Sequence, residues 1–244
     1  MRYSTQHAAY RPARSRRAIP TPARQALHTQ SSWVSRNGSP QPSHTSPSDA
    51  RLPCGAVTRQ DLPVQIFVSG TWNPEKARPY SAQAVELGAR IATAGLDLAC
   101  GPGTGIARYV IDGFRQAPAA GKVRYYLPRE ADMRAVGETV MPGADEIEQT
   151  ALDYPMRNLL QVKRSDGLFV LTGGDGALEE VIAAVVDYRV PVAIVTGAGT
   201  VATAVTALLD VYPAWRALVE FGPDVASLID PFLTRVGVAV TSRG

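Results

Sequence analysis

Apolar and polar residues alternate along the chain in two distinct patterns from residue 63 onward. Short runs rich in valine, isoleucine and phenylalanine predict buried strands, and longer stretches with apolar residues three and four positions apart predict helices. Strands are expected at 64–70, at 96–105 (a short strand that runs into a glycine-rich turn), and at 122–128, 166–174 and 190–197. Helices are expected at 81–95, from 106 onward, at 154–165, after the glycines of 173–176, and at roughly 201–211 and 223–236. This order predicts an α/β fold, a three-layer sandwich with a mostly parallel sheet.

One internal segment, residues 129–153, departs from this alternation. It is irregular and acidic, and it is far longer than an ordinary connection between a strand and a helix. Long connections of this kind are either functional or loosely structured. The sequence leaves two interpretations open, a loop that covers a substrate and a solvated excursion on the surface.

The charge distribution separates a basic leader from an acidic body. Residues 1–59 carry nine arginines and one acidic residue, a formal charge of +8, whereas the whole chain carries +3, which leaves −5 for residues 60–244. The leader has too few apolar residues to form a core, so we expect disorder at 1–59 and one nucleotide-binding domain at 60–244. The leader fits three interpretations: an inert tail or a misplaced start codon, a targeting segment, or a functional basic arm.

The same charge distribution limits the partners and the location. An acidic body is unsuited to nonspecific nucleic-acid binding. No apolar run approaches the roughly 18 residues of a membrane span, and no signal peptide is recognisable. We therefore expect a cytoplasmic protein with a small-molecule ligand, without a nucleic-acid or membrane partner.

Residues 60–244 contain no histidine, since His7, His28 and His44 all lie in the leader. This composition excludes a histidine general base, a Ser-His-Asp triad and a histidine-ligated metal from the body. Cys54 and Cys100, one in each part, form neither a disulfide framework nor a zinc site. We expect no metal and no cofactor.

Glycine-rich loops follow three of the predicted strands. They read SGTWNP at 69–74, CGPGTG at 100–105 and TGGDG at 172–176. The carboxyl ends of parallel strands meet at one edge of a sheet, where bare backbone N–H groups and helix N-termini bind anions. We therefore predict a phosphate or nucleotide site built from Ser69, Gly70, Thr71, Gly101, Gly103, Thr104, Gly105, Gly173, Gly174, Asp175, Gly176 and Ala177.

Other phosphate-binding motifs fit these loops less well. No Gly-Lys-Ser or Gly-Lys-Thr sequence is present, which argues against a P-loop NTPase. The sequence GPGTGIA matches the dinucleotide-binding fingerprint only loosely, without a clear acidic residue to bind the ribose. The GGDG of lipid and NAD kinases precedes a large β-rich domain, whereas the residues after Glu180 are predicted as αβα.

The run MRNLLQVKRSDGLFVLTGGDGALEEV at 156–181 resembles the signature of the LOG-like Rossmann proteins, often labelled lysine decarboxylases. This family includes cytokinin-activating phosphoribohydrolases and molybdenum-cofactor carrier proteins. Its pattern is an arginine on a helix, then Ser-Asp, an apolar strand and Pro-Gly-Gly-x-Gly-Thr-x-x-Glu. The resemblance covers about residues 63–210 and implies a Rossmann-like fold and a homodimer or higher homo-oligomer.

The resemblance also implies roles for individual residues. Arg157 and Glu180 match the catalytic pair of the hydrolases, and Gly173, Gly174 and Gly176 match the glycines that cradle the phosphate. The implied reaction is hydrolysis of a nucleoside 5′-monophosphate to free base and ribose 5-phosphate, which requires neither histidine nor metal. The alternative is a noncatalytic carrier of a nucleotide or of molybdenum cofactor.

Three positions depart from the hydrolase pattern, and they keep the alternative open. Thr172 replaces the usual proline, Asn158 replaces a lysine, and Ala177 replaces a threonine. A helical wheel adds a second alternative for Glu180. With Leu178, Val181, Ile182 and Val185 as the apolar stripe, Glu180 points away from the core, as a solvated residue of the first turns would.

Overall fold

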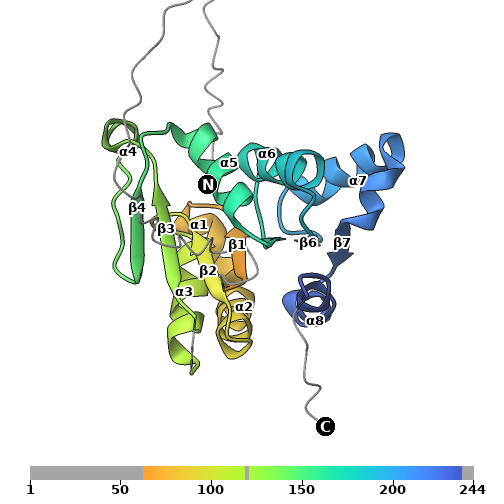
Figure 1. Ribbon diagram of the computed structural model, residues 1–244, viewed down its shortest axis with the longest axis horizontal. Coiled ribbons are helices and arrows are strands. Elements are labelled where there is room, and N and C mark those ends of the chain that lie inside the picture. Colours follow the sequence, from red (N-terminus) through yellow and green to blue (C-terminus); the bar gives the residue numbers. More distant parts are fainter. Residues whose placement is uncertain (1–62, 119–120, 238–244) are drawn as a thin grey trace, which may run out of the picture. The chain divides into compact units, whose positions relative to one another are not determined.

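The computed structural model describes residues 63–118 and 121–237, so the predicted leader at 1–59 lies outside the described residues. Figure 1 labels the elements, whose order is β1 (Gln65–Ser69), α1 (Pro74–Ala77), α2 (Ser81–Thr93), β2 (Asp97–Cys100), α3 (Ile106–Gln116), β3 (Val123–Leu127), α4 (Glu130–Val136), β4 (Glu146–Gln149), α5 (Tyr154–Arg164), β5 (Gly167–Val170), α6 (Asp175–Ala183), β6 (Val192–Val195), α7 (Val201–Val211), β7 (Val219–Gly222) and α8 (Val225–Arg235). Short helical turns lie at Arg78–Tyr80, Ala184–Tyr188 and Pro213–Ala217.

The described strands form one seven-stranded sheet in the order β4-β3-β2-β1-β5-β6-β7. Every neighbouring pair is parallel. The predicted Rossmann-like α/β fold is therefore confirmed, with a sheet that is parallel throughout. Parallel strands are buried on both faces, which explains why β1, β2, β5 and β6 consist of continuous buried runs that the sequence reveals.

The two outer strands, β4 and β7, were not expected from the sequence. β4 reads EIEQ and is largely exposed, and β7 reads VEFG and is only partly buried. An edge strand has one unpaired side and little apolar burial, so its sequence lacks the continuous apolar run of a central strand. The prediction that 129–153 is irregular throughout is accordingly wrong, because this segment contains both α4 and β4.

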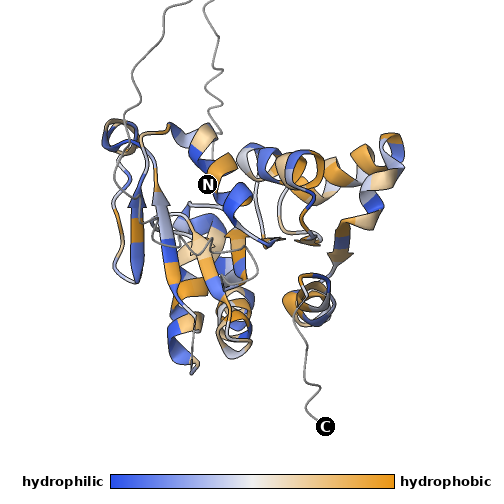
Figure 2. Cartoon of the chain, viewed as in Figure 1, coloured by the Kyte–Doolittle hydropathy of each residue, from blue (hydrophilic) through white to orange (hydrophobic). Residues whose placement is uncertain are grey.

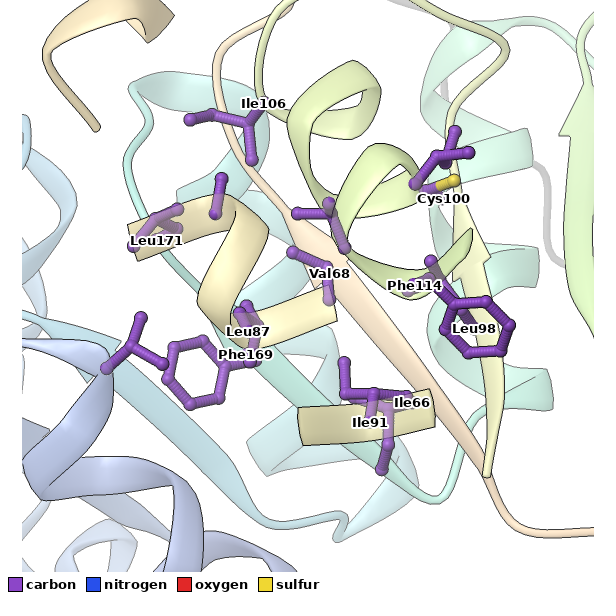
Figure 3. Packing of buried hydrophobic residues seen from close by; sticks show 14 of the residues in the cluster. Ile66, Val68, Leu87, Ile91, Leu98, Cys100, Ile106, Phe114, Phe169 and Leu171 are labelled. Atoms are coloured by element: carbon purple, nitrogen blue, oxygen red, sulfur yellow. The ribbon is translucent and has the colours of Figure 1, made fainter. Parts of the chain in front are cut away.

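Helices cover both faces of the sheet, and alternate residues of each strand point to opposite layers. Ile66 and Val68 pack with α2, α3 and α8, whereas Phe67 between them packs with α5, α6 and α7. Figure 1 shows these two groups of helices on opposite sides of the sheet, and Figure 2 shows apolar colour both on the strands and on helices of the two groups. Figure 3 shows the first layer, in which Leu87, Ile91 and Phe114 of the helices meet the strands.

Two glycines allow α2 and α3 to touch by their backbones. A Cβ atom on Gly88 of α2 would lie 1.9 Å from Val110 O, and one on Gly113 of α3 would lie 1.9 Å from Val85 O. Because each glycine removes the side chain that would separate the axes, the two helices pack closely over β1 and β2. This packing fixes the start of α3, and with it the position of the glycine-rich loop that precedes α3.

Candidate functional site

The sheet changes its direction of progression between β1 and β5. From β1 the chain proceeds outward through β2, β3 and β4, and it then returns to pair β5 with the other side of β1. At such a switch point, neighbouring loops at the carboxyl ends of the strands diverge and open a crevice. The loops that follow β1 and β5 therefore flank the place where a ligand is expected.

Backbone hydrogen bonds join the three predicted loops into one assembly. Ile106 N, which ends the loop after β2, donates to Thr71 O in the loop after β1 at 3.0 Å. Leu171 N, at the end of β5, donates to Ser69 O at 3.1 Å. The loops after β1, β2 and β5 thus lie side by side at the carboxyl edge, as the sequence predicts.

Gly105 makes the approach of the first two loops possible. Its φ is +68°, and a Cβ atom there would lie 2.1 Å from Thr71 O and within 2.8 Å of Trp72 Cα. Thr104 Oγ1 donates to Trp72 O at 2.8 Å in the same contact. Gly105 is needed for the left-handed backbone and for this close packing.

A further loop, after β6, also reaches the site. Gly173 and Gly199 form an isolated parallel bridge, and Thr200 N donates to Gly173 O at 3.2 Å. Gly199 has a φ of +106°, and a Cβ atom there would lie 2.5 Å from Gly173 O. The loop after β5 is therefore held from both sides, by the end of β1 and by the loop after β6.

These loops surround a cavity of about 560 Å³. Almost all of the predicted site residues line it: Ser69, Gly70, Thr71, Gly101, Gly103, Thr104, Arg157, Gly173, Gly174, Asp175, Gly176, Ala177 and Glu180. Gly105, alone among the predicted residues, does not line the cavity and instead supports the contact between the loops. The structure thus brings residues from four separate segments of the sequence together.

The N-terminus of α6 forms one wall of this cavity. Gly174 is the N-cap residue and provides no side chain to cap the helix. A Cβ atom on Gly174 would meet no atom within 4 Å, and one on Gly176 would come no closer than 4.0 Å to Asn158 Nδ2. Helix N-termini have N–H groups without intrahelical acceptors and carry partial positive charge. The open space in front of α6 is therefore suited to an anion.

A second wall comes from α5, whose residues Tyr154, Arg157, Asn158 and Gln161 line the cavity. Asp153 caps this helix by accepting a hydrogen bond from Met156 N at 3.1 Å, which sets the helical phase. Tyr154, Arg157 and Gln161 then follow at spacings of three and four and share one face. Arg157 Nη1 donates to Gln161 Oε1 at 2.8 Å, and the guanidinium carbon lies 5.4 Å from the centre of the Tyr154 ring.

Arg157 is only 6% exposed, so its charge is largely removed from water. Burial lowers the pKa of the guanidinium, and the negative charges of Glu138 and Glu180 oppose this effect. An arginine stays protonated in proteins even when buried. The cavity wall therefore carries a fixed positive charge.

Glu180 lies within the wall formed by α6 and is also 6% exposed. Burial raises the pKa of its carboxyl to about 7, although a hydrogen bond with Ser69 and the charge of Arg157 both act to lower it. A carboxyl with a pKa near neutrality exchanges a proton readily at physiological pH. Glu180 is therefore suited to acid–base chemistry in the cavity.

The helical-wheel interpretation of Glu180 as a solvated residue is wrong. Ala177 and Val181 are buried in α6 together with Glu180, whereas Ile182 is 37% exposed and Glu179 is also exposed. The helical wheel defined the apolar stripe by large residues alone. In the structure, Ala177 and Ala183 of α6 are buried as well as Val181. The buried face of α6 is thereby rotated toward Glu180.

Several buried polar atoms of the cavity wall lack partners. Among the residues that the structure describes, Arg157 Nε, Gln161 Nε2 and Glu180 Oε2 have no hydrogen-bond partner. A buried polar group without a partner costs about 1–3 kcal/mol. Three such groups beside one cavity indicate a region that is completed by solvent or ligand.

Polar residues that were not predicted as site residues also line the cavity, among them Lys76, Glu138, Gln161 and Thr200. Gln161 follows Arg157 by one helical turn, and this spacing is the only sequence signal that would have identified it. Glu138 lies in the acidic segment 129–153, and one of its carboxylate oxygens accepts a hydrogen bond from the Tyr154 hydroxyl. Part of this segment therefore borders the cavity, while β4 lies at the edge of the sheet.

Cys100 lies at the end of β2 and is fully buried. Burial raises the pKa of its thiol to about 12, and the charge of Arg157 lowers it only in part. Because the thiolate is the nucleophilic form, Cys100 is unreactive at neutral pH.

Glu180 makes the stability of the protein depend on pH. The unfolded carboxyl ionises near its ordinary pKa of 4.5, while the buried carboxyl keeps its proton until about pH 7. Between these values the folded state binds more protons than the unfolded state, so the free energy of unfolding falls as the pH rises. Relative to the Glu180→Gln variant, the wild type is expected to lose about 2–4 kcal/mol between about pH 4 and about pH 8.

Urea denaturation of both proteins across this range measures the difference. Glutamine stays neutral, so subtracting the two curves cancels the other titrating groups. A constant difference between the two proteins at all pH values would contradict the raised pKa of Glu180.

A parallel seven-stranded sheet with a glycine-lined cavity at its switch point defines the class of the protein, a Rossmann-like α/β protein. The chain belongs to the SLOG cluster4 family, whose model matches residues 63–212. The predicted resemblance to LOG-like proteins is thus confirmed. No curated protein sequence matches the chain.

Solved structures share this fold at low sequence identity. The molybdenum cofactor carrier protein MCP of Chlamydomonas reinhardtii is 22% identical, with a TM-score of 0.59 over 73% of this chain and 100% of that one. The molybdenum cofactor binding protein of the phototrophic bacterium Rippkaea orientalis is 19% identical, with a TM-score of 0.53 over 70% of this chain and 94% of that one.

Within the described residues, no helix combines the length and apolar character needed to cross a membrane.

Proposed function

We propose that the protein binds a nucleoside 5′-monophosphate in this cavity and hydrolyses its N-glycosidic bond. The observation that carries the proposal is the meeting of Arg157 and Glu180, each 6% exposed, beside the glycine-lined N-terminus of α6. The cavity of about 560 Å³ lies within the size range of small-molecule sites, about 300–1,000 Å³. These features suit a ligand with one anionic end and a bond that acid–base chemistry breaks.

The N-terminus of α6 is the proposed site of the 5′-phosphate. Gly174 and Gly176 leave the backbone accessible there, and the helix start carries partial positive charge. Arg157 contributes a full positive charge from α5. The phosphate would therefore be bound by backbone N–H groups and by the guanidinium.

Glu180 has the proposed catalytic role. As the C1′–N bond breaks, the sugar becomes an oxocarbenium-like cation, which the ionised carboxylate stabilises. The same carboxylate accepts a proton from the water that attacks C1′ and passes it, directly or through a water molecule, to the departing base, which leaves neutral while Glu180 becomes a carboxylate again. The products are free base and ribose 5-phosphate. A pKa of about 7 leaves roughly half of Glu180 ionised at neutral pH.

A second candidate function is a noncatalytic carrier of a phosphorylated ligand such as molybdenum cofactor. Asn158 and Ala177, which both line the cavity, support it because they replace the lysine and threonine of the hydrolase pattern. The two solved structures named above are molybdenum cofactor proteins with the same fold. A carrier would use Arg157 and the α6 N-terminus for binding but would not need proton transfer by Glu180.

A panel of nucleosides and their 5′-monophosphates tests these candidates. The protein is incubated with each compound, free base is measured by chromatography, and binding is measured in parallel by calorimetry. We expect free base from at least one monophosphate and much less from the matching nucleoside, because the phosphate anchors the substrate. Tight binding without any product would support the carrier, and neither binding nor product with any monophosphate would contradict nucleotide hydrolysis.

A further inference from the structure

Arg157 of α5 differs from Arg124 of β3 and Arg164 of α5 in the chemical nature of its side-chain partner. Arg124 pairs with Asp97 at 3.0 Å and Arg164 pairs with Glu148 at 2.7 Å, so carboxylates neutralise both. Among the described residues, Arg157 forms no ion pair, and its side-chain hydrogen bond goes to the neutral amide oxygen of Gln161 at 2.8 Å. The most buried of these three arginines is thus the one without a counter-charge in contact.

The orientation of the Gln161 amide follows from this contact. Arginine has only donors, so the atom of Gln161 that faces Nη1 must be the oxygen. The amide nitrogen, Nε2, then points elsewhere, and it has no partner among the described residues. Gln161 is 1% exposed, so packing fixes this side chain.

We propose that Gln161 is a positioning residue that holds Arg157 without neutralising it, so that the guanidinium charge remains available to an anionic ligand. This inference rests on the anion-binding part of the proposed function and not on hydrolysis. A carboxylate at this position would hold the guanidinium equally well, but it would supply the counter-charge that the ligand otherwise provides.

The other acids near Arg157 do not take this role. One oxygen of Glu138 accepts the Tyr154 hydroxyl hydrogen bond, and neither Glu138 nor Glu180 forms an ion pair with Arg157 among the described residues. Glu180 is moreover only partly ionised near neutral pH. Their charges reach Arg157 from a distance, and the contact position on α5 is occupied by a neutral group.

The test measures binding of inorganic phosphate and of adenosine 5′-monophosphate to the full chain by calorimetry. Gln161→Glu keeps the size and the acceptor but adds a charge, and Gln161→Met removes the acceptor without adding a charge. Arg157→Met gives the level of binding without the guanidinium. Gln116→Glu, at an exposed position of α3 away from the cavity, is the matched control for the change in net charge.

The two possible roles of Gln161 give opposite orders of affinity. If neutrality matters, we expect phosphate binding to weaken about 10- to 100-fold in Gln161→Glu and less than about tenfold in Gln161→Met. If Gln161 only holds Arg157 in place, Gln161→Glu binds like the wild type and Gln161→Met is the weaker of the two. The control Gln116→Glu is expected to bind like the wild type.

Each comparison can overturn the inference independently. Wild-type affinity in Gln161→Glu would overturn it, and so would weaker binding by Gln161→Met than by Gln161→Glu. If Gln161→Glu does not fold, Gln161→Met still decides, because wild-type affinity in this variant would show that Gln161 does not position Arg157. Absence of phosphate binding in the wild type would also contradict the inference, whereas binding without hydrolysis would contradict only the proposed reaction.

Discussion

Replacing Glu180 with glutamine is expected to lower the rate of base release from a nucleoside 5′-monophosphate about 10²- to 10⁴-fold. Glutamine keeps the shape of the side chain but neither accepts the proton of the attacking water nor stabilises a cationic sugar. Because the α6 N-terminus and Arg157 are unchanged, binding of phosphate is expected to stay close to that of the wild type. The loss should therefore appear in kcat and only weakly in the dissociation constant.

Glu179→Gln is the matched control for this prediction. Glu179 is the preceding residue of α6, but it is exposed, whereas Glu180 is buried in the cavity wall. Both variants remove one carboxylate from the same helix, so a general effect of charge on α6 would appear in both. Steady-state rates for the two variants, with phosphate binding measured in parallel, separate the site from the helix. Unchanged turnover in Glu180→Gln would remove Glu180 from the mechanism.

Replacing Gly105 with alanine is expected to lower the free energy of unfolding by about 2–5 kcal/mol. Two effects combine at this position. The φ of +68° is unfavourable for any residue with a Cβ atom, and that Cβ would lie 2.1 Å from Thr71 O, which is a backbone atom. Relief requires the loops after β1 and β2 to separate, so the cavity should be disturbed as well.

Gly95→Ala separates the two effects. Gly95 has a similar φ of +74°, but a Cβ atom there would meet no atom within 4 Å. Its replacement should therefore cost only the backbone strain, about 1–2 kcal/mol. Urea denaturation of the wild type and both variants gives the difference, which reports the contact between the loops. Equal losses in the two variants would show that this contact contributes little to stability.

The central strands could be predicted because their environment is uniform. β1, β5 and β6 are covered on both faces, so each must be apolar along its length, and such runs are visible in the sequence. β4 and β7 lie at the edges of the sheet and are partly exposed, so they contain both polar and apolar residues. A surface loop has the same mixed composition, so the sequence does not distinguish the two. β4 is recognised as a strand by its pairing with β3, and β7 by its pairing with β6. In both pairs the partner strand lies elsewhere in the sequence, so a local pattern does not reveal the pairing.

The loops of the candidate site could be predicted from the sequence better than the side chains that its helices contribute. Glycines directly after strands identified the loops at the carboxyl edge, and all three loops lie there. The side chains on the helices were harder, because which face of a helix is buried depends on its neighbours. Small alanines pack α6 against the sheet, and this reversed the predicted direction of Glu180. What these residues bind stays a prediction.

The α/β order, the family signature at 156–181 and the glycine-rich loops are local features of the chain, so they can be predicted from the amino-acid sequence alone. That Arg157, Gln161, Glu138 and Glu180 border one cavity follows from the fold and from no local pattern. The same is true of the neutral amide, rather than a carboxylate, that holds Arg157. The physical reason is that burial and charge pairing arise from the packing of α5 and α6 over the sheet, and no single segment of sequence specifies that packing.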